Sequence, residues 1–161
     1  MSNVTSSQTL PLAGKTALVT GGSRSIGAAI AKRLAADGAQ VAFTYNGSPK
    51  LAEEVAIEIE SAGGRAIAIE ADVADPAQVE ALVATALLAL GDIHVLVNNA
   101  GVLLDKPFLD TTDADWRRVM SVDLDAVFVV CRAVLPGMVA RGESGGGAIV
   151  NIASDLGLLG R

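Results

Sequence analysis

Two patterns of hydrophobic residues alternate along the chain. Short, mostly apolar runs occupy positions 16–20, 40–45, 65–71, 93–97 and 148–153. Such runs predict strands, and the uninterrupted run before Asn98 is typical of a strand that is covered on both faces. Between these runs, apolar residues repeat every three or four positions, which predicts amphipathic helices. The pattern therefore predicts a regular alternation of strands and helices.

Helix-start signals support this division. A polar residue that caps the helix precedes three of the predicted helices, and in two cases a proline follows at the first helical position. In the third predicted helix Gln78 can also return a hydrogen bond to the cap. We expect Pro136 and Gly137 to weaken the end of the long helix that starts near Thr112. The three signals are Ser48-Pro49, Asp75-Pro76, and Thr112 with Asp115.

Five strands separated by four helices, with short connections, predict right-handed crossovers and a parallel sheet. The expected fold class is therefore α/β: a Rossmann-type, doubly wound sheet in three layers that stops after the fifth strand. We expect one domain over residues 12–161, preceded by a flexible tail at 1–11.

Composition narrows the function classes. The 161 residues are 51% hydrophobic but only 3% aromatic, so the core must consist mainly of Ala, Val, Leu and Ile. A net charge of −6 argues against a nucleic-acid surface, which needs clustered Lys and Arg. No metal-ligand cluster is evident, and Cys131, the single cysteine, cannot form an internal disulfide. The sequence has neither a signal peptide at its start nor an apolar stretch long enough to span a bilayer, so we expect a cytoplasmic protein without a membrane partner.

The candidate site begins with the turn at residues 19–27, which is rich in glycine and serine and joins a strand to a helix. A helix that starts in such a turn presents unpaired N–H groups and a positive dipole end to an anion. Ligands of parallel sheets bind beyond the carboxyl ends of the strands, where Asp72, residues 98–101 and Ser154 also fall. These features together predict a site for a phosphate-bearing ligand.

Four motifs give the chain a specific resemblance. Residues 20–27 resemble the Thr-Gly-x-x-x-Gly-x-Gly turn of classical short-chain dehydrogenases/reductases, with Ser25 in place of the middle glycine. Asp72 stands where that family has its adenine-contacting Asp. Residues 98–101 match Asn-Asn-Ala-Gly, and residues 151–154 match the stretch that carries the catalytic serine. The chain thus resembles the first two-thirds of this family, in particular the β-ketoacyl-carrier-protein reductases.

The resemblance implies roles for particular residues. Ser154 would be catalytic, and Asp123 stands where the family has a catalytic Asn. The family's Tyr-x-x-x-Lys pair does not follow Ser154, and Tyr45, the sole tyrosine, is no substitute. Because a positioned proton donor contributes about 10²–10⁴-fold in rate, we expect the chain alone to be nearly inactive. The cofactor-binding residues would be Gly21, Ser23, Arg24, Ser25, Ile26, Gly27, Asn46, Ser48, Asp72, Val73, Asn99, Ala100 and Gly101.

Charge predicts which nicotinamide dinucleotide binds. An NAD site places a carboxylate after the second strand to accept from the ribose 2′-OH, and that carboxylate repels a 2′-phosphate. No Asp or Glu occurs between Ala39 and Ala52, whereas Arg24, Asn46 and Ser48 could hold a phosphate. The sequence therefore favours NADP over NAD.

Two interpretations remain open. In the first, the chain is the cofactor-binding part of an oxidoreductase that passes a hydride between NADP(H) and a carbonyl or alcohol substrate. In the second, it is a catalytically silent nucleotide-binding or oligomerising module. Exposure of Ile149, Val150 and Ile152 at the last strand would make the chain aggregation-prone or dependent on a partner. We also expect a homo-oligomer, with the long helix supplying part of the interface and Trp116 serving as a core or interface anchor.

Two rival motifs fail on their context. Residues 142–146 fit the hydrolase pattern Gly-x-Ser-x-Gly, but a helix precedes them and a strand follows, which is the reverse of what that serine needs. Gly22 and Gly27 have P-loop spacing, but Ala28-Ala29 replaces the required Lys and Ser/Thr. The sequence thus argues against a hydrolase and an NTPase.

Overall fold

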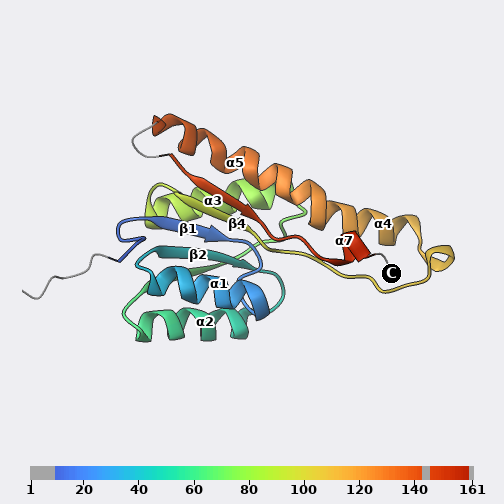
Figure 1. Cartoon of the computed structure of the whole chain (residues 1–161), viewed down its shortest axis with the longest axis horizontal. Coiled ribbons are helices and arrows are strands. Elements are labelled where there is room, and N and C mark those ends of the chain that lie inside the picture. Colours follow the sequence, from blue (N-terminus) through green and yellow to red (C-terminus); the bar gives the residue numbers. More distant parts are fainter. Residues whose placement is uncertain (1–9, 143–145, 160–161) are drawn as a thin grey trace, which may run out of the picture.

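The fold is a five-stranded parallel sheet between two layers of helices. The computed structural model describes residues 10–142 and 146–159. The sheet order is β3-β2-β1-β4-β5, and Figure 1 shows α1 and α2 on one face with α3 and α5 on the other. The predicted Rossmann-type α/β class is confirmed. The strands are β1 (Thr16–Val19), β2 (Gln40–Tyr45), β3 (Arg65–Glu70), β4 (Val95–Asn98) and β5 (Ala148–Asn151).

The helices follow the predicted alternation. A 3-10 turn, η1, precedes α4, and a π-helical segment, η2, joins α4 to α5. The last element, α7, is a single turn that the sequence pattern did not predict. The segments are α1 (Ser25–Ala36), α2 (Pro49–Ser61), α3 (Pro76–Leu90), η1 (Phe108–Asp110), α4 (Asp113–Met120), η2 (Ser121–Asp125), α5 (Ala126–Ala140) and α7 (Leu156–Leu159).

Two hydrophobic clusters hold the layers together. Successive side chains of a strand point to opposite faces of the sheet. Ala17 and Val19 accordingly pack toward α1 and α2, whereas Leu18 between them packs toward α3 and α5. Phe43, the largest fully buried side chain, belongs to the α1/α2 cluster. Because both faces of the central strands are buried, their sequences are continuous apolar runs.

The predicted cap of α2 is absent, whereas the predicted cap of α3 forms. Ser48 occupies the N-cap position of α2, but its side chain makes no cap hydrogen bond. Asp75 caps α3 as predicted, by accepting from the Ala77 backbone N–H at 2.9 Å. Gln78 returns a hydrogen bond to the cap residue as predicted, but through its side chain: Gln78 Nε2 donates to Asp75 Oδ2 at 3.0 Å, while the Asp75 backbone N–H donates to the Asp72 carbonyl. Gln78 Oε1 also accepts from the Asp72 backbone N–H at 2.9 Å.

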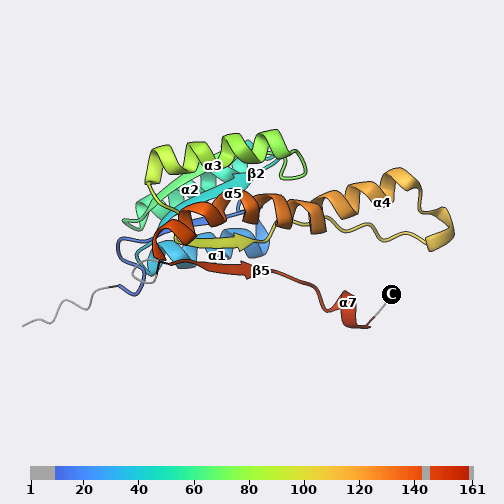
Figure 2. The ribbon, with the colours of Figure 1, turned by 90° about the horizontal axis from the view of Figure 1, so that it is seen from above.

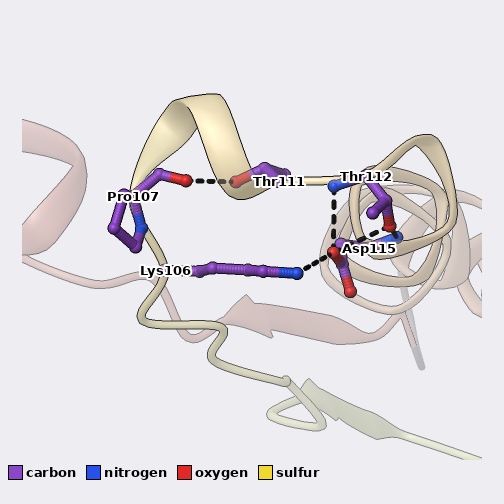
Figure 3. A network of polar contacts seen from close by, with 5 residues as sticks. All are labelled: Lys106, Pro107, Thr111, Thr112 and Asp115. Carbon is purple, nitrogen blue, oxygen red and sulfur yellow. Dashed lines mark hydrogen bonds and ion pairs between the residues drawn. The ribbon is translucent and has the colours of Figure 1, made fainter.

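The start of α4 is a capping box reinforced by a lysine (Figure 3). The Thr112 hydroxyl accepts from the Asp115 backbone N–H, and Asp115 Oδ2 accepts from the Thr112 backbone N–H at 2.9 Å. Lys106 Nζ donates to the same carboxylate oxygen at 2.7 Å. This lysine and the Thr112 groups hold the pKa of Asp115 well below its usual range. The capping box therefore starts α4, and Lys106 connects the preceding loop to the same carboxylate.

The predicted long helix is interrupted by a π-helical turn and continues past Pro136. The segment η2 lies between α4 and α5, and α5 runs through Pro136 to Ala140. The helix thus does not end at Pro136, and Val134 and Met138 on either side of it are buried in the α3/α5 cluster. Trp116 is 59% exposed, so it is not a core residue.

The β5 edge is poorly covered in the part of the chain described here. Val150 and Ile152 are 47% and 41% exposed, whereas Ile149 packs against the α3/α5 cluster. In Figure 2, β5 lies at the edge of the sheet, and the segment leading to α7 extends beyond the end of the sheet. Within residues 10–142 and 146–159, no helix is long and apolar enough to cross a membrane.

His94 forms two hydrogen bonds with Thr16 at the amino-terminal end of the sheet. Its backbone N–H donates to the Thr16 carbonyl, and its ring Nδ1 accepts from the Thr16 backbone N–H at 3.1 Å. Burial lowers the pKa of His94, and the nearby charges of Arg141 and Lys15 lower it further. Asp92 opposes this shift. Only the neutral ring can accept through Nδ1.

This geometry predicts a pH-dependent stability. Because the pKa of His94 is lower in the folded chain than its ordinary 6.5, the unfolded chain binds the proton first as the pH falls. The free energy of unfolding should therefore decrease below about pH 6.5 and stop decreasing below the folded pKa. Urea unfolding of the wild type and His94→Asn between about pH 5.5 and 7.5 measures this dependence. Equal pH slopes in the two proteins would contradict the role of His94, since it is the only histidine.

The first residue of α1 is strained. Ser25 has φ 49°, the only positive φ of a non-glycine residue in the described chain. The left-handed region costs an L-residue roughly 1–2 kcal/mol, whereas glycine adopts it freely. The structure thus gives a physical reason for the glycine that the resembling family has at this position.

We expect Ser25→Gly to stabilise the fold. Relief of the strained φ outweighs the greater backbone entropy of glycine in the unfolded chain, for a net gain of about 0.5–1 kcal/mol. The midpoint of urea unfolding measures the change. Ser23→Gly is the matched control, because Ser23 lies in the same turn without a positive φ and should lose stability. A lower midpoint for Ser25→Gly would show that the serine side chain contributes more than the strain costs.

Candidate cofactor site

A pocket of about 360 Å³ lies at the carboxyl ends of the strands. It extends from the end of β3 across β2 and β1 to the end of β4. Most of the predicted cofactor-binding residues meet there, although they come from four separate segments of the chain. They are Gly21, Ser23, Arg24, Ser25, Ile26, Gly27, Asn46, Asp72, Val73, Asn99, Ala100 and Gly101.

The glycine turn is fastened to the end of β4 by Thr20 and Asn99. The Thr20 hydroxyl accepts from the backbone N–H groups of Asn99 and Ala100 at 2.9 and 3.0 Å. In return, Asn99 Nδ2 donates to the carbonyls of Thr20 and Gly21 at 2.9 and 3.1 Å. These four bonds define the Thr20–Asn99 clamp, which fixes the turn relative to β4.

Close packing inside the turn requires glycine at position 27. A Cβ at Gly27 would lie 2.1 Å from the Gly21 carbonyl oxygen and 2.5 Å from Asn99 Nδ2. Both distances are far below van der Waals contact, and both atoms belong to the clamp. Gly27 thus lets α1 begin directly against the turn.

The start of α1 can bind an anion. The first backbone hydrogen bond of this helix runs from Ala28 N–H to the Arg24 carbonyl, and no side chain caps the helix among the described residues. The preceding N–H groups at Ser25, Ile26 and Gly27 belong to residues that line the pocket. Unpaired amides and the helix dipole favour a phosphate at this place.

The charged residues of the lining are Arg24, Asp72 and Arg118. Asp72 Oδ2 pairs with Arg118 Nη1 at 3.1 Å, so the single carboxylate is already neutralised. The structure records no ion pair for the Arg24 side chain within the part of the chain that it describes. The pocket is therefore positive at the edge where Arg24 lies beside the α1 terminus.

Three predicted site residues lie outside the pocket lining. Ser48 is at the start of α2. Ser154 is exposed beyond β5, where its hydroxyl accepts from the Leu156 backbone N–H at 3.2 Å. Asp123 lies in η2, and its Oδ1 accepts from the Val102 backbone N–H at 2.8 Å. Asp123 thus holds the start of the loop that follows the Asn99–Gly101 segment.

The lining also contains residues that the sequence analysis did not assign to the site: Thr44, Tyr45, Ala71, Val102, Arg118 and Val122. Thr44 supports the turn, because its hydroxyl accepts from the Gly21 backbone N–H at 2.9 Å. Arg118 carried no sequence signal, since its contact with Asp72 depends on the path of α4 beyond the carboxyl ends of the strands. The position of Thr44 near the end of β2 was the one available signal for that residue.

Comparison with known proteins gives the same assignment as the motifs. The profile of the family described as "short chain dehydrogenase" matches residues 15–161. An uncharacterised oxidoreductase of Methylorubrum extorquens is 43% identical over 143 residues, covering 89% of this chain and 56% of the relative. A 3-oxoacyl-(acyl-carrier-protein) reductase of Staphylococcus aureus is 39% identical, covering 91% of this chain and 58% of the relative.

Solved structures agree in fold. A short chain dehydrogenase of Burkholderia cenocepacia in complex with NADP has a TM-score of 0.84 and 47% identity, covering 93% of this chain and 59% of that one. A blue fluorescent protein from a metagenomic library, in complex with NADPH, has a TM-score of 0.85 and 48% identity, covering 93% of this chain and 60% of that one. The chain therefore spans somewhat more than half the length of these relatives. On this evidence, it belongs to the short-chain dehydrogenase family.

Proposed function

We propose that this chain is the NADP-binding part of an oxidoreductase. The observation that carries the proposal is the meeting of the glycine turn, Asp72 and the Asn99–Gly101 segment in one pocket at the carboxyl ends of the strands. Such an edge is where doubly wound sheets bind dinucleotides, with the pyrophosphate at the first helix. Two structural relatives are described in complex with NADP or NADPH, which supports the same ligand here.

Preference for NADP over NAD rests on charge at the adenosine end. The β2 strand is followed by Asn46, and the lining holds no carboxylate from the segment after β2. Arg24, with its planar guanidinium, can hold a 2′-phosphate through two parallel hydrogen bonds. The segment after β2 thus contributes no carboxylate to bind the ribose 2′-OH of NAD, and Arg24 offers a positive charge for the 2′-phosphate of NADP.

The reaction we propose is hydride transfer between the nicotinamide and the carbon of a carbonyl or alcohol substrate. The Ser154 hydroxyl would donate to the substrate oxygen and stabilise negative charge that develops there. Asp123 would contribute indirectly, by accepting a hydrogen bond from the Val102 backbone and so holding that segment in place. The 161 residues contain no Tyr or Lys after Ser154, so we propose that they bind the cofactor without turning over substrate by themselves.

Titration with the two cofactors tests this proposal. The wild-type chain should bind NADPH more tightly than NADH, by roughly 10-fold or more, because a charged hydrogen bond is worth about 1.5–3 kcal/mol. Arg24→Ala should remove most of that difference while leaving NADH affinity nearly unchanged. Lys32→Ala is a control, since Lys32 lies on α1 outside the pocket and pairs with Glu58. Tighter binding of NADH, or an unchanged NADPH affinity in Arg24→Ala, would contradict the preference.

We further propose that the chain forms a homo-oligomer through the outer face of η2 and α5. Leu124, Phe128, Leu135 and Val139 share one helical face, and all four are exposed. The buried residues of the same helix, such as Val130 and Val134, lie on the opposite face. Arg132 covers part of the exposed face, with its guanidinium 5.2 Å from the Phe128 ring centre. An apolar stripe of this length is typical of an interface.

A charge in that stripe should weaken association. Phe128→Glu is expected to shift the sedimentation of the chain toward monomer, because a carboxylate loses its hydration when two apolar faces meet. Leu88→Glu is the matched control, since Leu88 is 91% exposed on α3 and outside the stripe. Sedimentation velocity of the three proteins at equal concentration measures the effect. A wild-type chain that is monomeric at every concentration would contradict the proposal.

A further inference from the structure

The Arg118–Asp72 ion pair is the least expected feature of the pocket. Arg118 lies on α4 and Asp72 on the loop between β3 and α3, so the pair joins segments that are 46 residues apart in the sequence. Both residues line the pocket. Val122, four positions after Arg118, lines it as well, which places one face of α4 and η2 against the pocket.

Asp72 is held in place from three directions. Its backbone N–H donates to Gln78 Oε1, its Oδ1 accepts from the Ala74 backbone N–H at 3.0 Å, and its Oδ2 faces Arg118. An anchored carboxylate fixes the guanidinium that pairs with it. A guanidinium donates its hydrogen bonds in its own plane, so the contact with Asp72 does not use the flat face of Arg118, whose side chain is 49% exposed.

We propose that Arg118 forms a stacking wall for the purine ring of the dinucleotide. This inference rests on the proposed function, and it assigns the residue that recognises one half of the ligand. Asp72 and Val73 put the wall at the end of β3, on the far side of β1 from the end of β4. The dinucleotide crosses such a sheet from the adenosine side to the nicotinamide side, so the wall belongs to adenosine. Guanidinium groups stack on aromatic faces, and a purine has such a face.

A simpler role for Arg118 is to neutralise Asp72, and the two roles differ in which substitutions they tolerate. A lysine at position 118 keeps the positive charge near Asp72 but lacks the planar surface. If stacking matters, Arg118→Lys loses most of the affinity that Arg118→Ala loses. If only charge matters, Arg118→Lys binds like the wild type.

The test measures direct binding of NADPH and of 2′-phospho-ADP-ribose, which keeps the adenosine half and lacks nicotinamide. Arg118→Ala and Arg118→Lys should each weaken both ligands by the same factor, about 3- to 30-fold. Arg117→Ala is the matched control, because Arg117 is the neighbouring residue of α4, is exposed and does not line the pocket. It should bind both ligands as the wild type does.

The outcomes separate the inference from the function on which it rests. If the wild-type chain binds neither ligand, the proposed function is wrong and the inference is wrong with it. If the wild type binds and Arg118→Lys binds equally well, the stacking wall is wrong while the proposed function stands. A loss that appears with NADPH but not with 2′-phospho-ADP-ribose would also overturn the wall, because it would place Arg118 at the nicotinamide half.

Discussion

The Thr20–Asn99 clamp is the constraint on which the pocket depends. Its four hydrogen bonds join the turn after β1 to the end of β4. The two strands are neighbours in the sheet, although Thr20 and Asn99 are 79 residues apart in the sequence. Thr20 is buried, so these bonds are protected from competition with water. With the turn held from this side and by Thr44 from the other, α1 starts where its free N–H groups face the pocket. Position 27 must then be glycine, since any Cβ would break the clamp.

The fold could be predicted from the sequence because each local signal agrees with the parallel sheet. Apolar runs and a cap alone predicted strands at 40–45 and 65–71 and the start of α3 at Pro76, and the structure has the strands at 40–45 and 65–70. The structure differs from the pattern at single groups: the Ser48 side chain makes no cap hydrogen bond, Gln78 also accepts from the Asp72 backbone N–H, and α5 continues through Pro136. Such outcomes depend on tertiary contacts, which a pattern along the chain does not contain.

In the candidate site, too, local sequence determines some positions and tertiary contacts determine others. Residues within the recognised motifs, such as Gly21 and Asp72, line the pocket as expected, because a strand end fixes their place. Arg118 does not follow a strand, and no local pattern distinguishes it from Arg117. Only the path of α4 brings Arg118 to Asp72 and into the pocket lining, whereas Arg117 does not line the pocket. The identity of that arginine therefore required the structure.

The two halves of the carboxyl edge differ in how completely the described residues form them. From β3 to β4 the strands are covered on both faces, and hydrogen bonds join Thr44 and Asn99 to Gly21 and Arg118 to Asp72. Beyond β4, the chain holds Asn151 to Asn98 by a side-chain bond of 2.8 Å, but Ser154 is exposed and bonded only within its own segment. Under the proposed function, the first half would bind the cofactor and the second half would take part in proton transfer. Affinity for the cofactor would then be separable from turnover within this chain.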